Sequence, residues 1–207
     1  MKILAISGSR NRQGKTAFAI DNILKGVSSA GGNGESVFLP ELAIERCRQC
    51  DINGYGICRT EGRCIIEDDF PPVVDKIDKA DVCIFATPVY YSDLSESMRG
   101  FLDRFRRIRS ARMLPPGRPG LPSLPQGGDP AIGVCYAGRS GFGATLCAAT
   151  LERILQMSGF DIVDMIPIRR QNLDIKLPML EAVGRWLVTK PISGPMPPFP
   201  AVPTKPE

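Results

Sequence analysis

The chain has 207 residues, of which 43% are hydrophobic and 23% charged, and this composition is typical of a globular protein that buries one core. Its net charge of +4 is too small to indicate a nucleic-acid partner, and no apolar run reaches membrane-spanning length. The N-terminus lacks a signal-peptide pattern, so we expect a cytoplasmic protein. The absence of histidine excludes zinc sites with imidazole ligands and catalytic triads that need an imidazole base.

The first sixteen residues predict a buried strand that opens into an anion-binding loop. Residues 3–6 are apolar, and the chain then changes to glycine, serine and basic residues before residues 17–27 show apolar positions at helical spacing. Unpaired N–H groups at the N-terminus of this helix, together with its dipole, favour a phosphate. Hydroxyl groups and positive charges that could bind the phosphate come from Ser7, Ser9, Thr16, Arg10, Arg12 and Lys15.

A nucleotide-triphosphate P-loop is the main alternative for this segment, because Gly14-Lys15-Thr16 matches the end of that motif. Five residues separate Gly8 from Gly14, however, and the motif requires four. The acidic residue expected at the end of a later strand, where it would hold magnesium, is also missing, since Asp81 precedes its apolar run. We therefore favour a phosphate loop of another class, and a serine-rich turn without a ligand is the second alternative.

A second strand, a long loop and a second helix are expected next. Residues 35–39 predict a strand that ends at a proline, and a cysteine-rich loop occupies residues 41–67. Asp68 or Asp69 is suited to the N-cap of the helix, because two prolines then fall in its first turn. Apolar residues at helical spacing over residues 73–80 supply its inner face.

The third strand is predicted at residues 81–86, and the loop at its carboxyl end covers residues 87–93. A helix follows from about residue 95 with an apolar face surrounded by arginines, which we interpret as a solvated face rather than a nucleic-acid surface. We expect Arg104 to pair with Asp103 or with an acid on a neighbouring subunit. The residues expected in the core or at a subunit contact are Phe101, Leu102 and Phe105.

The rest of the chain adds two strands and two helices. Residues 111–130 are rich in proline and glycine, and we interpret them as an irregular excursion between the third and fourth strands. The features expected after it are a strand (131–137), a glycine-rich turn (138–143), a helix bearing the apolar residues Leu146, Leu151, Ile154 and Leu155, a strand (162–166), a helix (175–188) and a proline-rich tail (190–207).

Strands that alternate with helices in this way predict the α/β class, with a parallel sheet covered by helices on both faces. In such sheets ligands bind outside the carboxyl ends of the strands, where the strand order reverses. Three loops that follow strands should meet at this edge and could hold a phosphate, a flat ring and the far edge of that ring. They are residues 7–15, 87–93 and 138–142.

The same three loops resemble those of the flavodoxin-like NAD(P)H-dependent FMN reductases. The resemblance covers about the first 160 residues. It implies one flavodoxin-like FMN-binding domain over residues 1–189, with a doubly wound five-stranded parallel sheet. The matching segments are Gly8-Ser9, Gly14 and Thr16 for the phosphate loop, residues 87–91 and 98–104 for the ring-binding loop and its helix, and residues 138–143 for the third loop.

The resemblance also implies which residues contact FMN. Two positions in the phosphate loop depart from the family pattern, since Arg10 stands where proline is usual and Lys15 where asparagine is usual, and both keep or raise the positive charge. The FMN phosphate would be held by Ser9, Arg10, Arg12, Lys15 and Thr16. The isoalloxazine ring would be lined by Pro88, Val89, Tyr90 and Tyr91, with Gly138, Ser140 and Gly141 near its other edge.

Four of the seven cysteines lie in the loop at residues 41–67, and their chemistry suits an iron-sulfur cluster or a zinc ion equally. Reduced thiols or a loop disulfide are the remaining alternatives. The loop resembles the compact cysteine motif of iron-sulfur flavoproteins with a longer middle spacing, and the flavin context favours a cluster. The four expected ligands are Cys47, Cys50, Cys58 and Cys64, whereas Cys83, Cys135 and Cys147 are expected to be buried hydrophobic residues.

These observations predict an FMN-dependent oxidoreductase that passes electrons from NAD(P)H through FMN to an iron-sulfur cluster, a quinone or another acceptor. The alternatives are an electron-transfer flavoprotein without its own NAD(P)H activity and a zinc-stabilised nucleotide-binding module. No side chain is assigned a catalytic acid or base role, and Arg99 is a candidate for attracting the phosphates of NAD(P)H. Expected partners are small-molecule electron donors and acceptors and a redox protein, and the resemblance implies a homodimer or homotetramer.

Overall fold

The computed structural model describes residues 1–51, 54, 56–113 and 128–189. They contain a five-stranded sheet in the order β2-β1-β3-β4-β5, in which every neighbouring pair is parallel. The predicted α/β class and flavodoxin-like sheet are thereby confirmed. Most of the expected excursion and the proline-rich tail, residues 114–127 and 190–207, lie outside the described residues. The strands are β1 (Lys2–Ser7), β2 (Asn33–Phe38), β3 (Val82–Pro88), β4 (Asp129–Ala137) and β5 (Phe160–Arg169).

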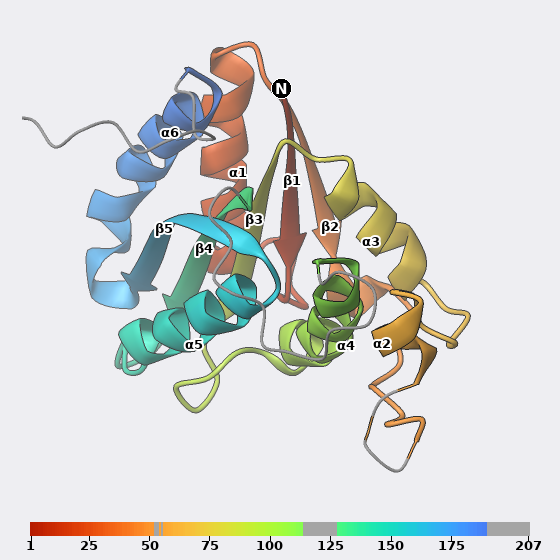
Figure 1. Cartoon of the computed structure of the whole chain (residues 1–207). Helices are drawn as coiled ribbons and strands as arrows, with labels where there is room; N and C mark the ends of the chain where they lie inside the picture. The colour runs from red at the N-terminus through yellow and green to blue at the C-terminus, as the bar shows by residue number, and fades with distance from the viewer. Residues whose placement is uncertain (52–53, 55, 114–127, 190–207) are drawn as a thin grey trace, which may run out of the picture.

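Helices cover both faces of the sheet (Figure 1). α1 and α6 pack against each other on one face, and α3, α4 and α5 form the layer on the other face. The short helix α2 and two single 3₁₀ turns were not predicted, because they are too short to show a period. The helices are α1 (Lys15–Ser29), α2 (Ile57–Thr60), α3 (Phe70–Asp78), α4 (Glu96–Met113), α5 (Ala144–Met157) and α6 (Leu173–Thr189), with 3₁₀ turns η1 (Leu39–Glu41) and η2 (Arg170–Asn172).

The contact between α1 and α6 brings the two backbones unusually close. A Cβ atom at Gly26 would lie 2.0 Å from the Glu181 carbonyl oxygen, and one at Gly184 would lie 1.9 Å from the Ile23 carbonyl oxygen. Only glycine fits at these two crossings, since any side chain would force the helices apart. Because α1 begins directly after the loop that follows β1, this packing fixes the position of that loop.

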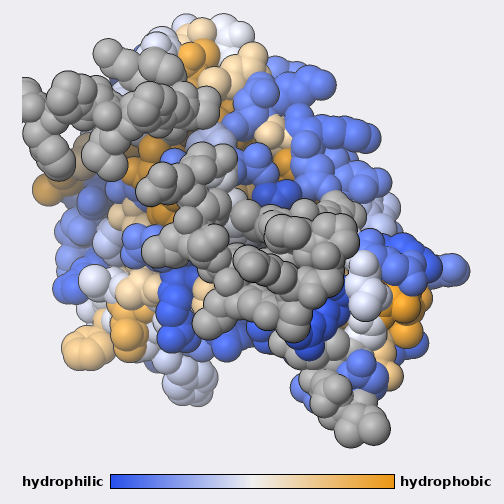
Figure 2. Space-filling model, viewed as in Figure 1, coloured by the Kyte–Doolittle hydropathy of each residue, from blue (hydrophilic) through white to orange (hydrophobic). Residues whose placement is uncertain are grey.

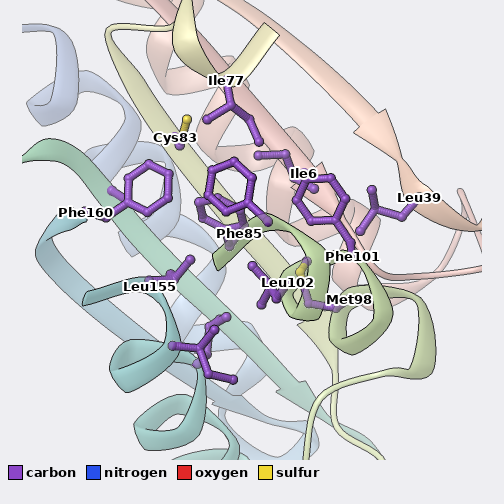
Figure 3. Packing of buried hydrophobic residues seen from close by; sticks show 14 of the residues in the cluster. Ile6, Leu39, Ile77, Cys83, Phe85, Met98, Phe101, Leu102, Leu155 and Phe160 are labelled. Carbon is purple, nitrogen blue, oxygen red and sulfur yellow. The ribbon is translucent and has the colours of Figure 1, made fainter. Parts of the chain in front are cut away.

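Aromatic side chains fill the core on the opposite face (Figure 3). The ring centroids of Phe85 and Phe160 are 5.2 Å apart, those of Phe105 and Phe160 are 5.8 Å apart, and those of Phe101 and Phe105 are 5.6 Å apart. Phe101, Leu102 and Phe105 are fully buried within the chain, so they belong to its own core. Aromatic pairs at these separations add about 0.5–1.5 kcal/mol each to the area they bury.

The helix after β4 corrects one sequence prediction. Leu146 was named with Leu151, Ile154 and Leu155 among the apolar residues that mark α5, but unlike those three it is 62% exposed. Cys147 takes the inward position instead, one residue and about 100° further along the helix, and is fully buried. Cys83 and Cys135 are also buried, which confirms the prediction that these three cysteines pack as hydrophobic residues.

The surface differs from one side of the molecule to the other. Figure 2 shows mainly hydrophilic residues over α3, whereas hydrophobic residues reach the surface near the start of α5. Exposed apolar side chains there include Phe142, which is 84% exposed. Within the part of the chain that the structure describes, no helix is long and apolar enough to span a bilayer.

Candidate functional site

The three loops that the sequence predicts as a site do gather at the carboxyl edge of the sheet, toward the bottom of the view in Figure 1. β1 and β3 are neighbours in the middle of the sheet, and the chain leaves them toward opposite faces, into α1 and α4. This is the switch point at which α/β sheets of this strand order bind ligands. The Gly8 N–H donates to the Ala86 carbonyl at 2.8 Å and fixes the first loop to the end of β3.

The loop between β1 and α1 is folded by its own short polar side chains. The Ser7 hydroxyl accepts a hydrogen bond from the Ser9 N–H at 3.2 Å, and the Asn11 side chain accepts one from the Gln13 N–H at 2.8 Å. The Gly14 N–H donates to the Asn11 carbonyl at 3.1 Å. Ser7 is fully buried, and its hydroxyl supports the loop through the hydrogen bond from the Ser9 N–H.

The first turn of α1 leaves backbone donors open. Among the described residues, the N–H groups of Lys15, Thr16 and Ala17 have no hydrogen-bond partner, as is usual for the first turn of a helix. Thr16, in the same first turn, is almost fully buried. Three N–H groups at the positive end of a 15-residue helix are donors that an anion could accept from.

The three basic side chains of this loop are not equivalent. Arg10 donates to Glu96 at 2.8 Å, and Arg12 makes a bidentate pair with Glu41. The hydrogen bond between Arg12 and Glu41 raises the pKa of the arginine and lowers the pKa of the carboxyl group, although both groups are exposed. Within the described part of the chain Lys15 has no carboxylate partner, and its ammonium lies 5.7 Å from the Phe18 ring centroid. Lys15 is therefore the cation most available to an anion.

The second loop ends in a tight turn at the edge of the site. The backbones of Tyr90 and Asp93 exchange two hydrogen bonds at 3.0 and 2.9 Å. Between them Tyr91 and Ser92 have φ angles of 51° and 66°. Residues other than glycine seldom adopt such angles, and positive φ at both central positions is typical of a type I′ turn. The Tyr91 side chain is fully exposed at the tip of this turn. The Val89 N–H donates to the Tyr136 carbonyl at 2.9 Å and anchors the base of the loop to β4.

A buried pair of hydroxyl groups, on Thr87 and Ser95, joins the first two loops. Thr87 lies in the predicted second loop, but sequence reasoning did not assign Ser95 to the site. The Ser95 hydroxyl donates to the Gly8 carbonyl at 2.9 Å, and the Ser95 N–H donates to the Thr87 hydroxyl at 3.0 Å. A Cβ atom at Gly8 would lie 2.3 Å from the Ser95 hydroxyl oxygen and 2.9 Å from the Met98 Cβ. The start of α4 thus packs directly on the first loop. The only sequence signal was a serine immediately before a helix.

The third loop packs against the second. Gly143 has a φ of 80°, and a Cβ atom there would lie 2.4 Å from the Ser92 hydroxyl oxygen. The Gly141 N–H donates to the Gly138 carbonyl at 2.7 Å, and the Gln171 side chain donates to the Ser140 carbonyl at 2.8 Å. The structure therefore brings the three predicted segments together through backbone contacts, which leave the exposed Tyr90 and Tyr91 side chains at the rim.

The four cysteines of the loop between β2 and α3 line one pocket, in a segment that projects at the lower right of Figure 1. All four are free thiols, of which Cys50 is exposed and Cys47, Cys58 and Cys64 are half-buried. Arg104 of α4 lines the same pocket. Among the described residues, no three Cys, Asp or Glu side chains are grouped closely enough to hold a metal ion as they stand.

Beneath this pocket Arg104 is 2% exposed, and the expected pairing with Asp103 or a neighbouring subunit is wrong. Its guanidinium makes two hydrogen bonds to Asp68 at 2.6 and 3.0 Å, one to the Glu45 carbonyl at 3.0 Å and one to the Cys64 sulfur at 3.4 Å. Burial alone would raise the pKa of Asp68, but hydrogen bonds from Arg104 and from two backbone N–H groups outweigh it and hold that pKa below its usual range. Helical geometry explains the correction, because Asp103 precedes Arg104 by one residue and faces solvent.

A groove of about 490 Å³ separates the phosphate loop from the cysteine loop. Its apolar wall comes from η1, from the segment that leads to the first cysteine and from Phe101 of α4, and Arg10 and Arg46 lie at its rim. The two candidate sites are therefore adjacent regions of one edge of the molecule. The apolar wall consists of Leu39, Pro40, Leu42, Ile44 and Phe101.

Together the fold and these loops define a flavodoxin-like α/β protein with open N–H donors at the switch point between β1 and β3. The chain belongs to the NADPH-dependent FMN reductase family, whose model matches residues 1–171. This match includes the three loops at the carboxyl edge and the complete cysteine loop.

Individual relatives agree with this assignment. An iron-sulfur flavoprotein of Methanocaldococcus jannaschii is 30% identical over 109 residues, which are 53% of this chain and 54% of that protein. An iron-sulfur flavoprotein of Archaeoglobus fulgidus is 32% identical over 109 residues, 53% of this chain and 51% of that protein. The chain thus spans about half the length of these curated relatives.

Solved structures agree with the fold. The NAD(P)H:quinone oxidoreductase from Methanothermobacter marburgensis has a TM-score of 0.62 at 20% identity, over 90% of this chain and 96% of that chain. An archaeal flavodoxin has a TM-score of 0.56 at 12% identity, over 91% of this chain and 96% of that chain. At such low identities these similarities establish the fold alone.

Proposed function

We propose that the chain binds FMN along the carboxyl edge of the sheet and uses it to oxidise NAD(P)H. The observation that carries this proposal is the set of open N–H groups at Lys15, Thr16 and Ala17, which supply donors for a phosphate at the switch point of a flavodoxin-like sheet. Ser9, Arg10 and Arg12 complete the predicted phosphate loop. The family match over residues 1–171 supports FMN as the phosphate ligand.

The residues at the edge fit the rest of the cofactor. The isoalloxazine ring would lie between the loop that carries Pro88, Val89, Tyr90 and Tyr91 and the loop that carries Gly138, Ser140 and Gly141. The contact of Gly143 with Ser92 holds these two loops at a fixed separation, and the exposed tyrosines at the rim offer flat apolar surface to a ring.

Bound FMN supplies the chemistry that the side chains lack, since it accepts a hydride from NAD(P)H and returns the electrons one or two at a time. The protein would bind the phosphate, orient the ring and limit access of water to it. None of these three roles needs an acid or base side chain, which suits a chain without histidine. We retain the homodimer or homotetramer as a prediction.

For the electron acceptor we propose an iron-sulfur cluster held by Cys47, Cys50, Cys58 and Cys64. The donor chemistry fits, because four free thiols line a single pocket, and thiolates are the usual ligands of such clusters. Arg104 lines the same pocket, and its buried Nε atom has no hydrogen-bond partner among the described residues. An unpaired buried donor beside four thiols favours an anionic, sulfur-containing group there.

The experiment is to purify the chain without oxygen and to measure its visible spectrum and its FMN, iron, sulfide and zinc content. We expect one FMN per chain and iron with sulfide. Flavin without metal would leave an FMN reductase whose acceptor is a quinone or another small molecule, and zinc without iron or flavin would support the nucleotide-binding module.

Steady-state oxidation of NADPH with a quinone acceptor then tests the enzymatic part of the proposal. We expect turnover that depends on bound FMN. Protein with full FMN that does not oxidise either NADPH or NADH would instead be an electron-transfer flavoprotein that serves protein partners. Light scattering during gel filtration would check the predicted dimer or tetramer.

A further inference from the structure

Arg104 occupies an unusual place for an arginine, buried in the protein beneath a loop of cysteines. Its side chain is 1% exposed, and the Asp68 carboxylate that it binds is 7% exposed. Its guanidinium carbon lies 4.1 Å from the centre of the Phe70 ring, which covers one face. An arginine on the surface of α4 would cost the protein nothing, whereas a buried ion pair carries a desolvation penalty of several kcal/mol per ion. Because burial of Arg104 carries this desolvation penalty, we ask what the residue does besides packing.

We propose that Arg104 is a positioning residue that holds Cys64 in place and donates an N–H to its sulfur, and that it thereby raises the reduction potential of an iron-sulfur cluster in this loop. The inference rests on the proposed function, since it assumes that the four cysteines bind such a cluster. It goes further by naming a residue outside the cysteine loop that sets a property of the cluster.

The two terminal nitrogens of the Arg104 guanidinium share Asp68 as an acceptor but differ in their second acceptor. One terminal nitrogen donates to Asp68 at 2.6 Å and to the Glu45 carbonyl at 3.0 Å. The other donates to Asp68 at 3.0 Å and to the Cys64 sulfur at 3.4 Å. Because Asp68 binds both nitrogens, the planar guanidinium cannot rotate away, and the N–H that faces Cys64 is held in position.

The third nitrogen strengthens the inference. Arg104 Nε is buried, and it has no hydrogen-bond partner among the described residues, although buried arginine donors are normally paired. The residue lines the same pocket as the four cysteines. A sulfide or a second thiolate sulfur in that pocket would accept this hydrogen bond and complete the coordination of the guanidinium.

The expected effect on the potential follows from charge. Reduction adds one electron to a cluster and breaks no bond, so any group that stabilises negative charge on the sulfurs favours the reduced state. A buried positive charge and N–H donors to cluster sulfurs both act in that direction, and hydrogen bonds to the sulfurs are a known determinant of cluster potential. Removal of Arg104 should therefore make the cluster harder to reduce.

The test compares the midpoint potential of the cluster, measured by EPR-monitored redox titration, in the FMN-loaded wild type and in Arg104→Met and Arg104→Lys. Methionine keeps much of the volume without charge or donors, and lysine keeps the charge but loses the planar pair of donors. Arg109→Lys is the matched control, because Arg109 is a nearly buried, ion-paired arginine of the same helix that does not line the cysteine pocket.

We expect a shift to a more negative potential that is largest in Arg104→Met and smaller in Arg104→Lys, with no shift in Arg109→Lys. Equal potentials in the wild type and both Arg104 variants would overturn the inference, as would an equal shift in the Arg109 control. If Arg104→Met does not retain iron while FMN stays bound, Arg104→Lys decides the question. Loss of iron from both Arg104 variants would show that Arg104 only holds the loop in place, and it would overturn the claim about the reduction potential.

The same samples separate this inference from the proposed function. A wild type that lacks iron and sulfide after anaerobic purification would overturn the proposed cluster, and the inference with it. A wild type that contains the cluster, together with Arg104 variants of unchanged potential, would overturn the inference alone.

Discussion

The phosphate loop and the cysteine loop lie next to each other but are stabilised in different ways. Residues 8–14 are held by backbone hydrogen bonds and by close contacts at Gly8, where even one methyl group would clash with Ser95. The described residues of the cysteine loop are joined to the core by the buried side chain of Ile66, by partly buried apolar side chains and by the hydrogen bonds of the buried pair of Arg104 and Asp68. We therefore expect the first loop to respond most strongly to added volume at Gly8, and the second to loss of its buried ion pair. This difference determines which substitutions should damage each loop.

The largest effect is expected at the buried ion pair. Asp68→Ala leaves the Arg104 guanidinium buried without its carboxylate, and removal of one partner of a buried pair typically costs about 3–5 kcal/mol. We expect the free energy of unfolding, measured with urea, to fall by about this amount. The cysteines should become accessible to thiol reagents at lower urea concentration than in the wild type.

The matched control for this substitution is Asp103→Ala on the exposed side of the same helix. Its contacts with Arg106 at 3.6 Å and Arg99 at 3.9 Å are long and between partly exposed groups, so the change should be within about 0.5 kcal/mol. Equal effects at Asp68 and Asp103 would show that the buried pair does not anchor the cysteine loop.

A smaller effect is expected from added volume in the phosphate loop. Gly8→Ala would place a Cβ atom 2.3 Å from the Ser95 hydroxyl oxygen, and such overpacking costs about 1–3 kcal/mol. Because Gly8 lies in the loop itself, FMN affinity should fall together with stability. Isothermal titration calorimetry of the flavin-free protein with FMN measures the affinity, and urea unfolding measures the stability.

Gly100→Ala provides the contrast, since a Cβ atom at Gly100 would meet nothing within 4 Å. Alanine in the interior of α4 should raise the stability by about 0.5–1 kcal/mol and leave FMN affinity unchanged. If Gly8→Ala also left FMN affinity unchanged and did not lower the stability, the tight contact between the loop and α4 would not be needed for FMN binding or for stability.

The charge dependence of the cysteine loop should also appear in its response to acid. The pKa of Asp68 is lowered in the folded protein, so its ion pair contributes stability at pH values above the ordinary aspartate pKa of 3.8. That contribution decreases below pH 3.8 and is lost once the pH falls below the folded-state pKa. We expect the difference in unfolding free energy between the wild type and Asp68→Asn to narrow over that range. A difference that stays constant down to acid pH would contradict the assigned pairing.

The smallest effects concern single charges around the phosphate. Lys15→Ala should weaken FMN binding by about five- to tenfold, or about 1–1.4 kcal/mol, because Lys15 has no carboxylate partner among the described residues. Arg12→Ala should matter less, since Glu41 already neutralises this arginine. Lys25→Ala, at an exposed lysine of α1 that pairs with Glu181, is the control for lost charge. A larger loss from Arg12→Ala than from Lys15→Ala would reverse this ranking.

The structure also shows which features could be predicted from the sequence and which could not. The strands, the longer helices and the three loops at the carboxyl edge follow from local patterns, because a buried strand and an amphipathic helix each repeat within a few residues. The position of Leu146 was missed because several residues of α5 fit an apolar face, and only packing selects between Leu146 and Cys147.

Contacts between distant segments could not be predicted in the same way. Arg104 and Asp68 are 36 residues apart, and the Ser95 hydroxyl reaches the Gly8 carbonyl across 87 residues. No local pattern carries this information, since partners at such separations are chosen by the packing of α4 against both loops. The FMN and cysteine ligands themselves stay predictions until they are tested.

The most direct test of the account is a fluorescence titration of flavin-free protein with FMN and, in parallel, with riboflavin, which lacks the phosphate. The account predicts that FMN binds at least about tenfold more tightly, because the N–H groups at the start of α1 hold the phosphate. Equal affinities for the two flavins, or no binding of FMN, would contradict the assignment of this loop as the phosphate site and with it the proposed function.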